Sequence, residues 1–241
     1  MRALALDTTT RGGSVALVVD DRVVDQRAGD ASRSHAERLP TELLRVGDAH
    51  GVAIAAVDLF AVAAGPGSFT GLRIGIATMQ GLAFVERRPV IAVSALDALA
   101  QIAAMDLAPA AIVAAWIDAQ RGDVYSAAYR VTSAPPFAPE RLAAIAAPSV
   151  ADPAAIVEEW ARAGVAPARC VGDGAVRYAG TIAERLPDAA IAGAPLLAGA
   201  IGRIAIVRAQ RGDTGHPAAV QPLYVRRPDA ELDRERRALS P

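Results

Sequence analysis

Residues 57–71 read VDLFAVAAGPGSFTG, and this stretch decides the interpretation of the fold. The apolar run over 57–64 is typical of a buried strand, and the turn Gly65-Pro66-Gly67 leads into a predicted helix over about 70–85. A strand that enters a helix through a glycine-rich turn indicates a sheet covered by helices. The turn is not a Walker A loop, because no Gly-Lys-Ser/Thr follows, and its last two glycines stand too far apart for the dinucleotide fingerprint.

On the N-terminal side, three short strands are predicted, over residues 2–7, over residues 14–19 and around Val23 and Val24. Ser34-His35-Ala36-Glu37 fits a capping box and predicts a helix from Ser34 to about His50.

On the C-terminal side, a strand over 89–93 precedes Ser94-Ala95-Leu96-Asp97, a second capping pattern that predicts a helix to about Met105. Together these elements form an α/β lobe with a mixed sheet.

A second lobe repeats part of this order. A predicted strand over 111–117 ends on Asp118, a glycine-containing turn follows, and a strand over 124–130 returns. The first lobe begins in the same way, with a strand that ends on Asp7, a turn and a returning strand. Further predictions are an irregular connection over 135–139, helices over 153–163, 175–185 and 195–210, and a strand near 168–172. We therefore expect an N-terminal lobe over 1–106, a C-terminal lobe over 107–227 and a charged tail over 228–241, with the helix over 195–210 a candidate to pack back on the first lobe.

Composition limits the function. The 241 residues are 53% hydrophobic, carry a formal net charge of −1 and have a pI of about 6.3. Such a chain lacks the basic surface that grips nucleic acid alone, so any work on RNA requires a partner. The single Cys170 and the scattered His35, His50 and His216 offer no disulfide framework and no short-range metal site. No stretch resembles a signal peptide or membrane span, so we expect a soluble cytoplasmic protein.

Two groups of residues are candidate functional sites. Asp7, Thr8 and Thr9 end the first strand, where ligands bind in open α/β sheets, and Gly67 and Ser68 precede a helix N-terminus that favours anions. A nucleotide or phosphate contact is one interpretation, and simple turn capping and close helix packing are the others.

The predicted helix over 70–85 has two apolar sides. Leu72, Ile76, Met79 and Ala83 form one face, while the opposite side is small rather than charged, so the helix is either buried or covered by another protein. We predict that this helix and the one from Ser34 to His50 form a partner-binding face, the alternative being that both are core elements. The predicted interface residues are His35, Leu39, Leu43, Val46, Gly71, Gly75, Thr78 and Met79.

The sequence resembles the TsaB family, also called YeaZ. The resemblance rests on motifs spread over residues 1 to about 227, namely Leu6–Thr10, Ser34–Pro40, Gly65–Gly75, Gly81–Ala83, Val93–Leu96, Asp118–Tyr125 and Pro222–Arg226. It implies an actin/Hsp70/sugar-kinase-like, ribonuclease H-like fold, with two lobes that each hold a mixed sheet flanked by helices.

The resemblance also implies a role. TsaB pairs with the catalytic paralogue TsaD, the ATPase TsaE joins them, and the complex transfers threonylcarbamoyl to an adenosine of tRNA. TsaD carries an H-x-x-x-H metal pair where this chain has Ala95 and Leu99. The expectation is a non-catalytic scaffold that binds no cofactor or metal itself, leaves ATP and metal to its partners, meets tRNA only through the complex, and homodimerises when TsaD is absent. The alternatives are a small ATPase or kinase of the same fold and, third, a peptidase.

Overall fold

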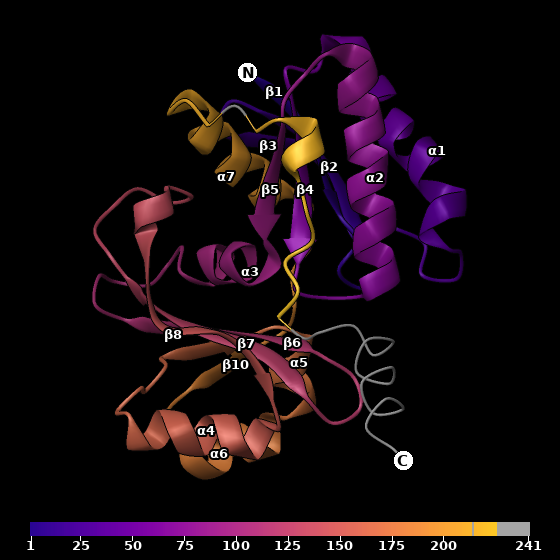
Figure 1. Ribbon diagram of the computed structural model, residues 1–241. Coiled ribbons are helices and arrows are strands. Elements are labelled where there is room, and N and C mark those ends of the chain that lie inside the picture. Colours follow the sequence, from indigo (N-terminus) through magenta and orange to yellow (C-terminus); the bar gives the residue numbers. More distant parts are fainter. Residues whose placement is uncertain (214, 226–241) are drawn as a thin grey trace, which may run out of the picture.

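The computed structural model describes residues 1–213 and 215–225, which form two lobes stacked one above the other (Figure 1). The charged tail expected over 228–241 lies outside the described residues. Each lobe contains a five-stranded sheet whose faces carry helices. The predicted fold class, with two mixed sheets flanked by helices, is confirmed.

The first sheet has the order β3-β2-β1-β4-β5. Its first three strands are antiparallel neighbours, and β4 and β5 continue parallel to β1. Helices α1 and α2 cover one face, and α3 and α7 cover the other. The bounds are β1 (Arg2–Asp7), β2 (Ser14–Val19), β3 (Arg22–Ala28), β4 (Leu59–Gly65), β5 (Val90–Ser94), α1 (His35–Asp48), α2 (Phe69–Glu86), α3 (Ala95–Ala103) and α7 (Ala198–Gln210).

The second sheet has the order β10-β9-β6-β7-β8, with β6, β7 and β8 antiparallel and β9 and β10 parallel to β6. Helices α4, α5 and α6 cover its outer face, while α3 contacts β6 from the inner side. The bounds are β6 (Ile112–Asp118), β7 (Val124–Val131), β8 (Leu142–Ala151), β9 (Arg169–Val171), β10 (Ala190–Ala192), α4 (Pro153–Arg162), α5 (Asp173–Arg177) and α6 (Ala179–Arg185). Helix α3 is thus packed between the two sheets (Figure 1).

Local sequence signals explain the helix starts. Ser34 closes the predicted capping box with Glu37, and Ser94 Oγ accepts a hydrogen bond of 3.2 Å from the backbone N–H of Asp97. Ser68 does the same for α2, accepting from Gly71 N–H at 3.2 Å.

The structure departs from the prediction for the second lobe at three places. The strand β8 and the short edge strand β10 were not predicted, and the expected helix over 175–185 is split at Tyr178 into α5 and α6. Tyr178 has φ −108° and ψ 27°, which is not helical backbone.

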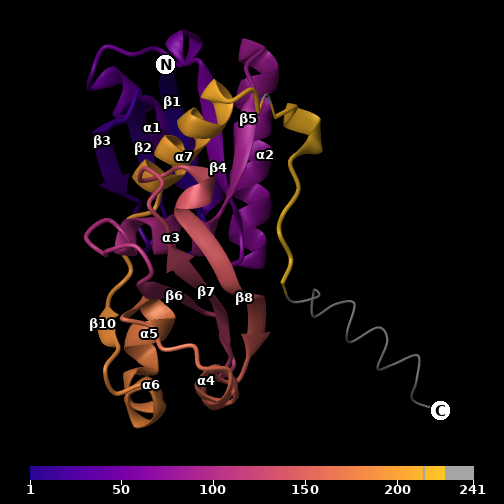
Figure 2. The ribbon, with the colours of Figure 1, turned by 90° about the vertical axis from the view of Figure 1, so that its left-hand side faces the viewer.

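Beyond α7, the described residues 215–225 run back along the first lobe as a strap (Figure 2). The side chain of Gln80 donates to the carbonyls of Pro217 and Val220 at 2.7 and 3.1 Å. Leu223 N–H donates to the carbonyl of Ala64 at 2.7 Å. The strap therefore ends at the carboxyl end of β4, between the lobes.

Candidate partner-binding face and interlobe cleft

A cleft of about 1000 Å³ lies between the lobes. From the first lobe, the turn after β1, the loop before α1 and the N-terminus of α2 line the cleft. From the second lobe, the β6–β7 turn and Asp173 line it. The strap adds Leu223, Tyr224 and Val225. The cleft therefore lies at the carboxyl ends of β1 and β4, where an open α/β sheet binds ligands.

Only part of the predicted phosphate site faces this cleft. Thr9, Gly67 and Ser68 line it, but Asp7 and Thr8 are buried behind it. The carboxylate of Asp7 accepts hydrogen bonds from the backbone and hydroxyl of Thr9, at 2.8 and 2.6 Å. Burial raises the pKa of Asp7 despite those bonds, and the negative charge of Asp173 raises it further. The turn-capping interpretation of Asp7 is therefore the one that the geometry favours.

Tight packing explains the glycines of α2. A Cβ on Gly71 would lie 2.3 Å from the carbonyl oxygen of Thr8, and one on Gly75 would lie 2.3 Å from Thr8 Oγ1. Both glycines therefore allow α2 to approach the first turn. Their assignment to an outer interface was wrong, because both are buried against Thr8 of the same lobe, although Gly71 also lines the interlobe cleft.

Four apolar residues of the predicted interface are also core residues. Leu39, Leu43, Val46 and Met79 are buried against the strands β1, β2 and β4. Their side chains contact their own sheet and cannot contact a partner, so these assignments were wrong. The predicted apolar face of Leu72, Ile76, Met79 and Ala83 is confirmed as buried, and Ile76, Met79 and Ala83 pack in the cluster against the sheet.

His35 fixes the first turn rather than an outer surface. Its Nε2 lies 3.2 Å from the Thr10 carbonyl oxygen and its Nδ1 lies 2.7 Å from a guanidinium nitrogen of Arg38. Because a carbonyl only accepts and Arg38 only donates, the ring is neutral with its proton on Nε2. Burial lowers the pKa of His35, and the positive charge of Arg38 lowers it further. Arg38 is itself buried and donates to the Gly12 carbonyl.

The outer surfaces of α1 and α2 carry apolar residues that the prediction did not include. Phe84 is 81% exposed, Val85 is 74% exposed and Leu44 is 50% exposed. Exposed Ala77 and Gly81 and half-buried Thr78 lie on the same outer side of α2. A stripe of apolar and small residues with no charge between Ala77 and Val85 is typical of a binding surface. The lack of a polar face in the sequence of 70–85 was the available signal.

Positions 95 and 99 are filled by packed aliphatic side chains. Ala95 and Leu99 lie in the core cluster shared by α3, α7 and both sheets. Within the described chain, no three His, Cys, Asp or Glu side chains gather in a way that could hold a metal ion. In the same residues, no helix combines the length and the hydropathy needed to cross a bilayer.

The fold and the cleft define a class, the two-lobed proteins of the actin/Hsp70/sugar-kinase type. A family model described as "TsaD: tRNA N6-adenosine threonylcarbamoyltransferase" matches residues 27–178. The structure of YeaZ from Pseudomonas aeruginosa superposes with a TM-score of 0.72 and 33% identity, over 92% of this chain and 99% of that one. A second Pseudomonas aeruginosa structure, titled as an uncharacterized protein with similarity to peptidase YEAZ, gives a TM-score of 0.75 and 34% identity, over 93% and 99% of the two chains.

Curated relatives agree in name. The TsaB protein of Escherichia coli is 39% identical over 130 residues, which are 54% of this chain and 55% of that protein. The TsaB protein of Haemophilus influenzae is 41% identical over 124 residues, which are 51% of each chain. The matched region thus spans about half the length of these curated relatives. The chain belongs to the TsaB (YeaZ) family, within the TsaD-type group that the family model describes.

Proposed function

We propose that this chain is the non-catalytic scaffold subunit of a cytoplasmic complex that makes N6-threonylcarbamoyladenosine in tRNA. It pairs with TsaD and recruits TsaE. The curated relatives are named as tRNA threonylcarbamoyladenosine biosynthesis proteins, which supports this pathway.

The observation that carries the non-catalytic role is the packing of α3. Ala95 and Leu99 are wholly enclosed by apolar neighbours, and the family resemblance aligns them with the metal-binding histidines of TsaD. Methyl groups do not ligate metal ions, and an ion placed in this core would lose its hydration without gaining ligands. We infer that this chain binds no metal or cofactor alone, and that ATP and metal belong to the partners.

The partner-binding face follows from the exposed stripe on α2. Phe84, Val85 and Leu44 expose apolar area to water. Covering that area with a partner lowers the free energy of the chain. TsaD, as a paralogue of the same fold, offers a matching pair of helices, and the two proteins would pack as a four-helix layer. Without TsaD the same face would meet a second copy, giving a homodimer.

The near-neutral charge supports contact with tRNA only within the complex. A net charge of −1 leaves no excess of cations for the phosphate backbone. We expect weak or no binding of tRNA by the isolated chain at physiological salt, measured by gel shift.

Reconstitution tests the proposal. A mixture of tRNA, ATP, threonine, bicarbonate, the adenylate-forming enzyme, TsaD and TsaE should produce the modified nucleoside only when this chain is added. The chain in place of TsaD should produce none. Modified nucleoside from the chain without TsaD, or full activity without the chain, would overturn the proposal.

A second candidate is an ATPase or kinase acting in the interlobe cleft. Its volume of about 1000 Å³ and the hydroxyls of Thr9 and Ser68 favour it. Calorimetric titration of the isolated chain with MgATP separates the candidates, because the scaffold proposal expects no heat of binding.

A further inference from the structure

We propose that the two lobes are locked to each other by a joint on the side of α3 and α7, so that the interlobe cleft does not close. The chain crosses between the lobes twice, over residues 104–111 and 193–197. Two connecting segments between lobes commonly form a hinge, and motion between the lobes is expected unless their interface is large and apolar. Here one buried apolar cluster contains residues of both lobes, and polar contacts add to it. The inference holds whichever partner the chain has.

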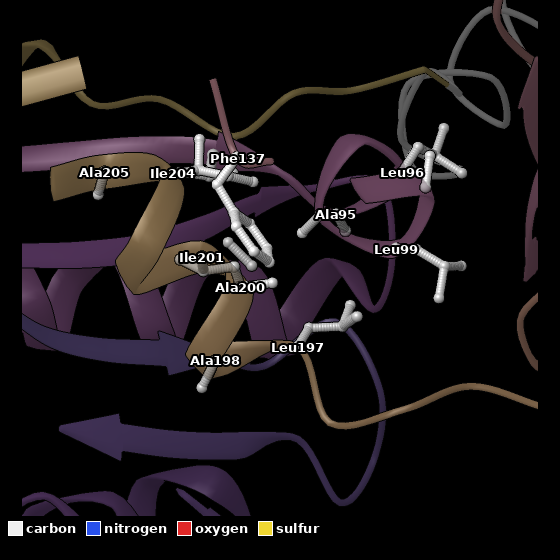
Figure 3. Packing of buried hydrophobic residues seen from close by; sticks show 14 of the residues in the cluster. Ala95, Leu96, Leu99, Phe137, Leu197, Ala198, Ala200, Ile201, Ile204 and Ala205 are labelled. Atoms are coloured by element: carbon white, nitrogen blue, oxygen red, sulfur yellow. The ribbon is translucent and has the colours of Figure 1, made fainter. Parts of the chain in front are cut away.

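The apolar centre of the joint is Phe137. This residue belongs to the second lobe, at the tip of the loop between β7 and β8, yet it is 3% exposed and packs in the cluster formed by α3 and α7. Its ring points toward Ala200 and Ile201 of α7 (Figure 3), and both residues belong to the same buried cluster. The guanidinium carbon of Arg203 lies 3.9 Å from the ring centroid on the remaining side.

The backbone at Phe137 is held as firmly as the ring. Gln101 of α3 is buried, its Oε1 accepts from Phe137 N–H at 2.9 Å, and its Nε2 donates to the Ala138 carbonyl at 3.0 Å. A buried amide with both ends paired fixes its neighbours in one arrangement. Phe137 also has φ +64°, a conformation that side chains other than glycine keep only when surrounding contacts impose it.

Further contacts spread along α3 and its C-terminal end. Tyr129 of β7 donates to Asp97 at 2.6 Å, and Arg169 of β9 donates to the Ala103 carbonyl at 2.7 Å. Arg141, buried just before β8, donates to the Ala104 carbonyl at 3.1 Å.

These contacts come from strands β7 and β9 and from the turn before β8, and all of them reach α3 or Ala104 directly after it. Because Phe137 packs on α7 as well, a rotation of the second lobe about α3 would break that packing. Enzymes of the two-lobed type that close on a substrate exclude water by such a rotation. A joint that resists it keeps the cleft at one width and presents the rims of both lobes as one rigid surface.

Distances between spin labels test the lock. Arg33→Cys in the first lobe and Val176→Cys in the second are exposed positions of opposite lobes, and buried Cys170 takes up no label. Pulsed electron resonance should give one narrow distance distribution, as narrow as that of a pair within the first lobe, Arg33→Cys with Val24→Cys. A broad or two-peaked distribution in the unmodified joint, or a shift of the mean by more than a few ångströms on adding MgATP, would overturn the proposal.

Variants of the joint, measured with the same pair of spin labels, give a second test. Phe137→Gly removes the ring but keeps a residue suited to the backbone, and Gln101→Ala removes both clamp hydrogen bonds. Each should broaden the distribution at least twofold, whereas Ser133→Ala, an exposed change in the same loop, should not. Circular dichroism checks folding, and if Phe137→Gly does not fold, Gln101→Ala decides. A folded Gln101→Ala variant with an unchanged narrow distribution would refute the role of the clamp.

Discussion

Phe84→Ala is the sharpest test of the partner-binding face. Phe84 is 81% exposed, and because an aromatic side chain buries about 200 Å² when enclosed, a partner can remove about 160 Å² of it from water. At about 25 cal/mol per Å², that area corresponds to about 4 kcal/mol. Alanine keeps the Cβ, and ordering the ring in the complex costs about 1 kcal/mol, so we expect a net loss of about 2 kcal/mol. The Kd for TsaD should then rise about 30-fold.

Calorimetry with TsaD measures this change, and sedimentation equilibrium measures the matching change in the homodimer. The free energy of unfolding of the isolated variant should stay within about 0.5 kcal/mol of wild type, because the ring contacts little in the free chain. Val176→Ala is the control, since it removes another exposed apolar side chain (53% exposed) from α5 of the other lobe. A folded Phe84→Ala variant with less than a threefold change in Kd would place the interface elsewhere.

Three other predictions follow from the same helices. Thr78→Arg adds a charge beside the exposed stripe, so pull-down of TsaD and the homodimer should be lost while circular dichroism stays native; retained binding would contradict the interface. Gly75→Val should lower the free energy of unfolding by about 3 kcal/mol in urea titrations because its Cβ meets Thr8 Oγ1, whereas Gly81→Ala, with open space around it, should raise it by about 0.5–1 kcal/mol. The pKa of His35 in the folded chain is lowered from 6.5, so acidification through that value protonates the unfolded chain first. The Tm should therefore fall as the pH is lowered from 7.5 to 5.5, and His35→Gln should flatten this dependence. An equal slope of Tm against pH in both proteins would exclude His35 as its source.

The first lobe could be predicted because its signals are local. Residues 59–65 are continuously apolar, and Ser34 and Ser94 mark helix starts with capping patterns that the structure contains. The strand β8 was missed because half of Leu142–Ala151 is alanine, and the segment lies at a sheet edge and shows no alternation. Its pairing with β7 joins residues that are distant in the sequence, and no local pattern indicates it.

The candidate site was predicted less well because the sequence does not say what covers an apolar residue. Leu39 and Leu43 have the spacing of a helix face, which fits burial against a sheet of the same chain as well as burial against a partner. Gly71 and Gly75 indicate a close approach, but the sequence does not reveal that the neighbour is Thr8. In Phe84 the distinguishing property is exposure, which only the fold supplies.

The place of α3 connects the proposed loss of catalysis with the joint. The resemblance aligns Ala95 and Leu99 with residues that hold a metal in TsaD, and metal ligands there must reach a site open to substrate. In this chain the same helix lies between two sheets, and Leu99 comes so near the second lobe that a Cβ on Gly172 would lie 2.9 Å from it. A histidine in that space would bring a polar ring into an apolar cluster, and burying such a ring without a hydrogen bond costs several kcal/mol. Ala95 and Leu99 offer no metal ligands, and they supply part of the surface against which the second lobe packs. A helix cannot serve both roles with the same two side chains, and here the packing role is the one that the structure fills.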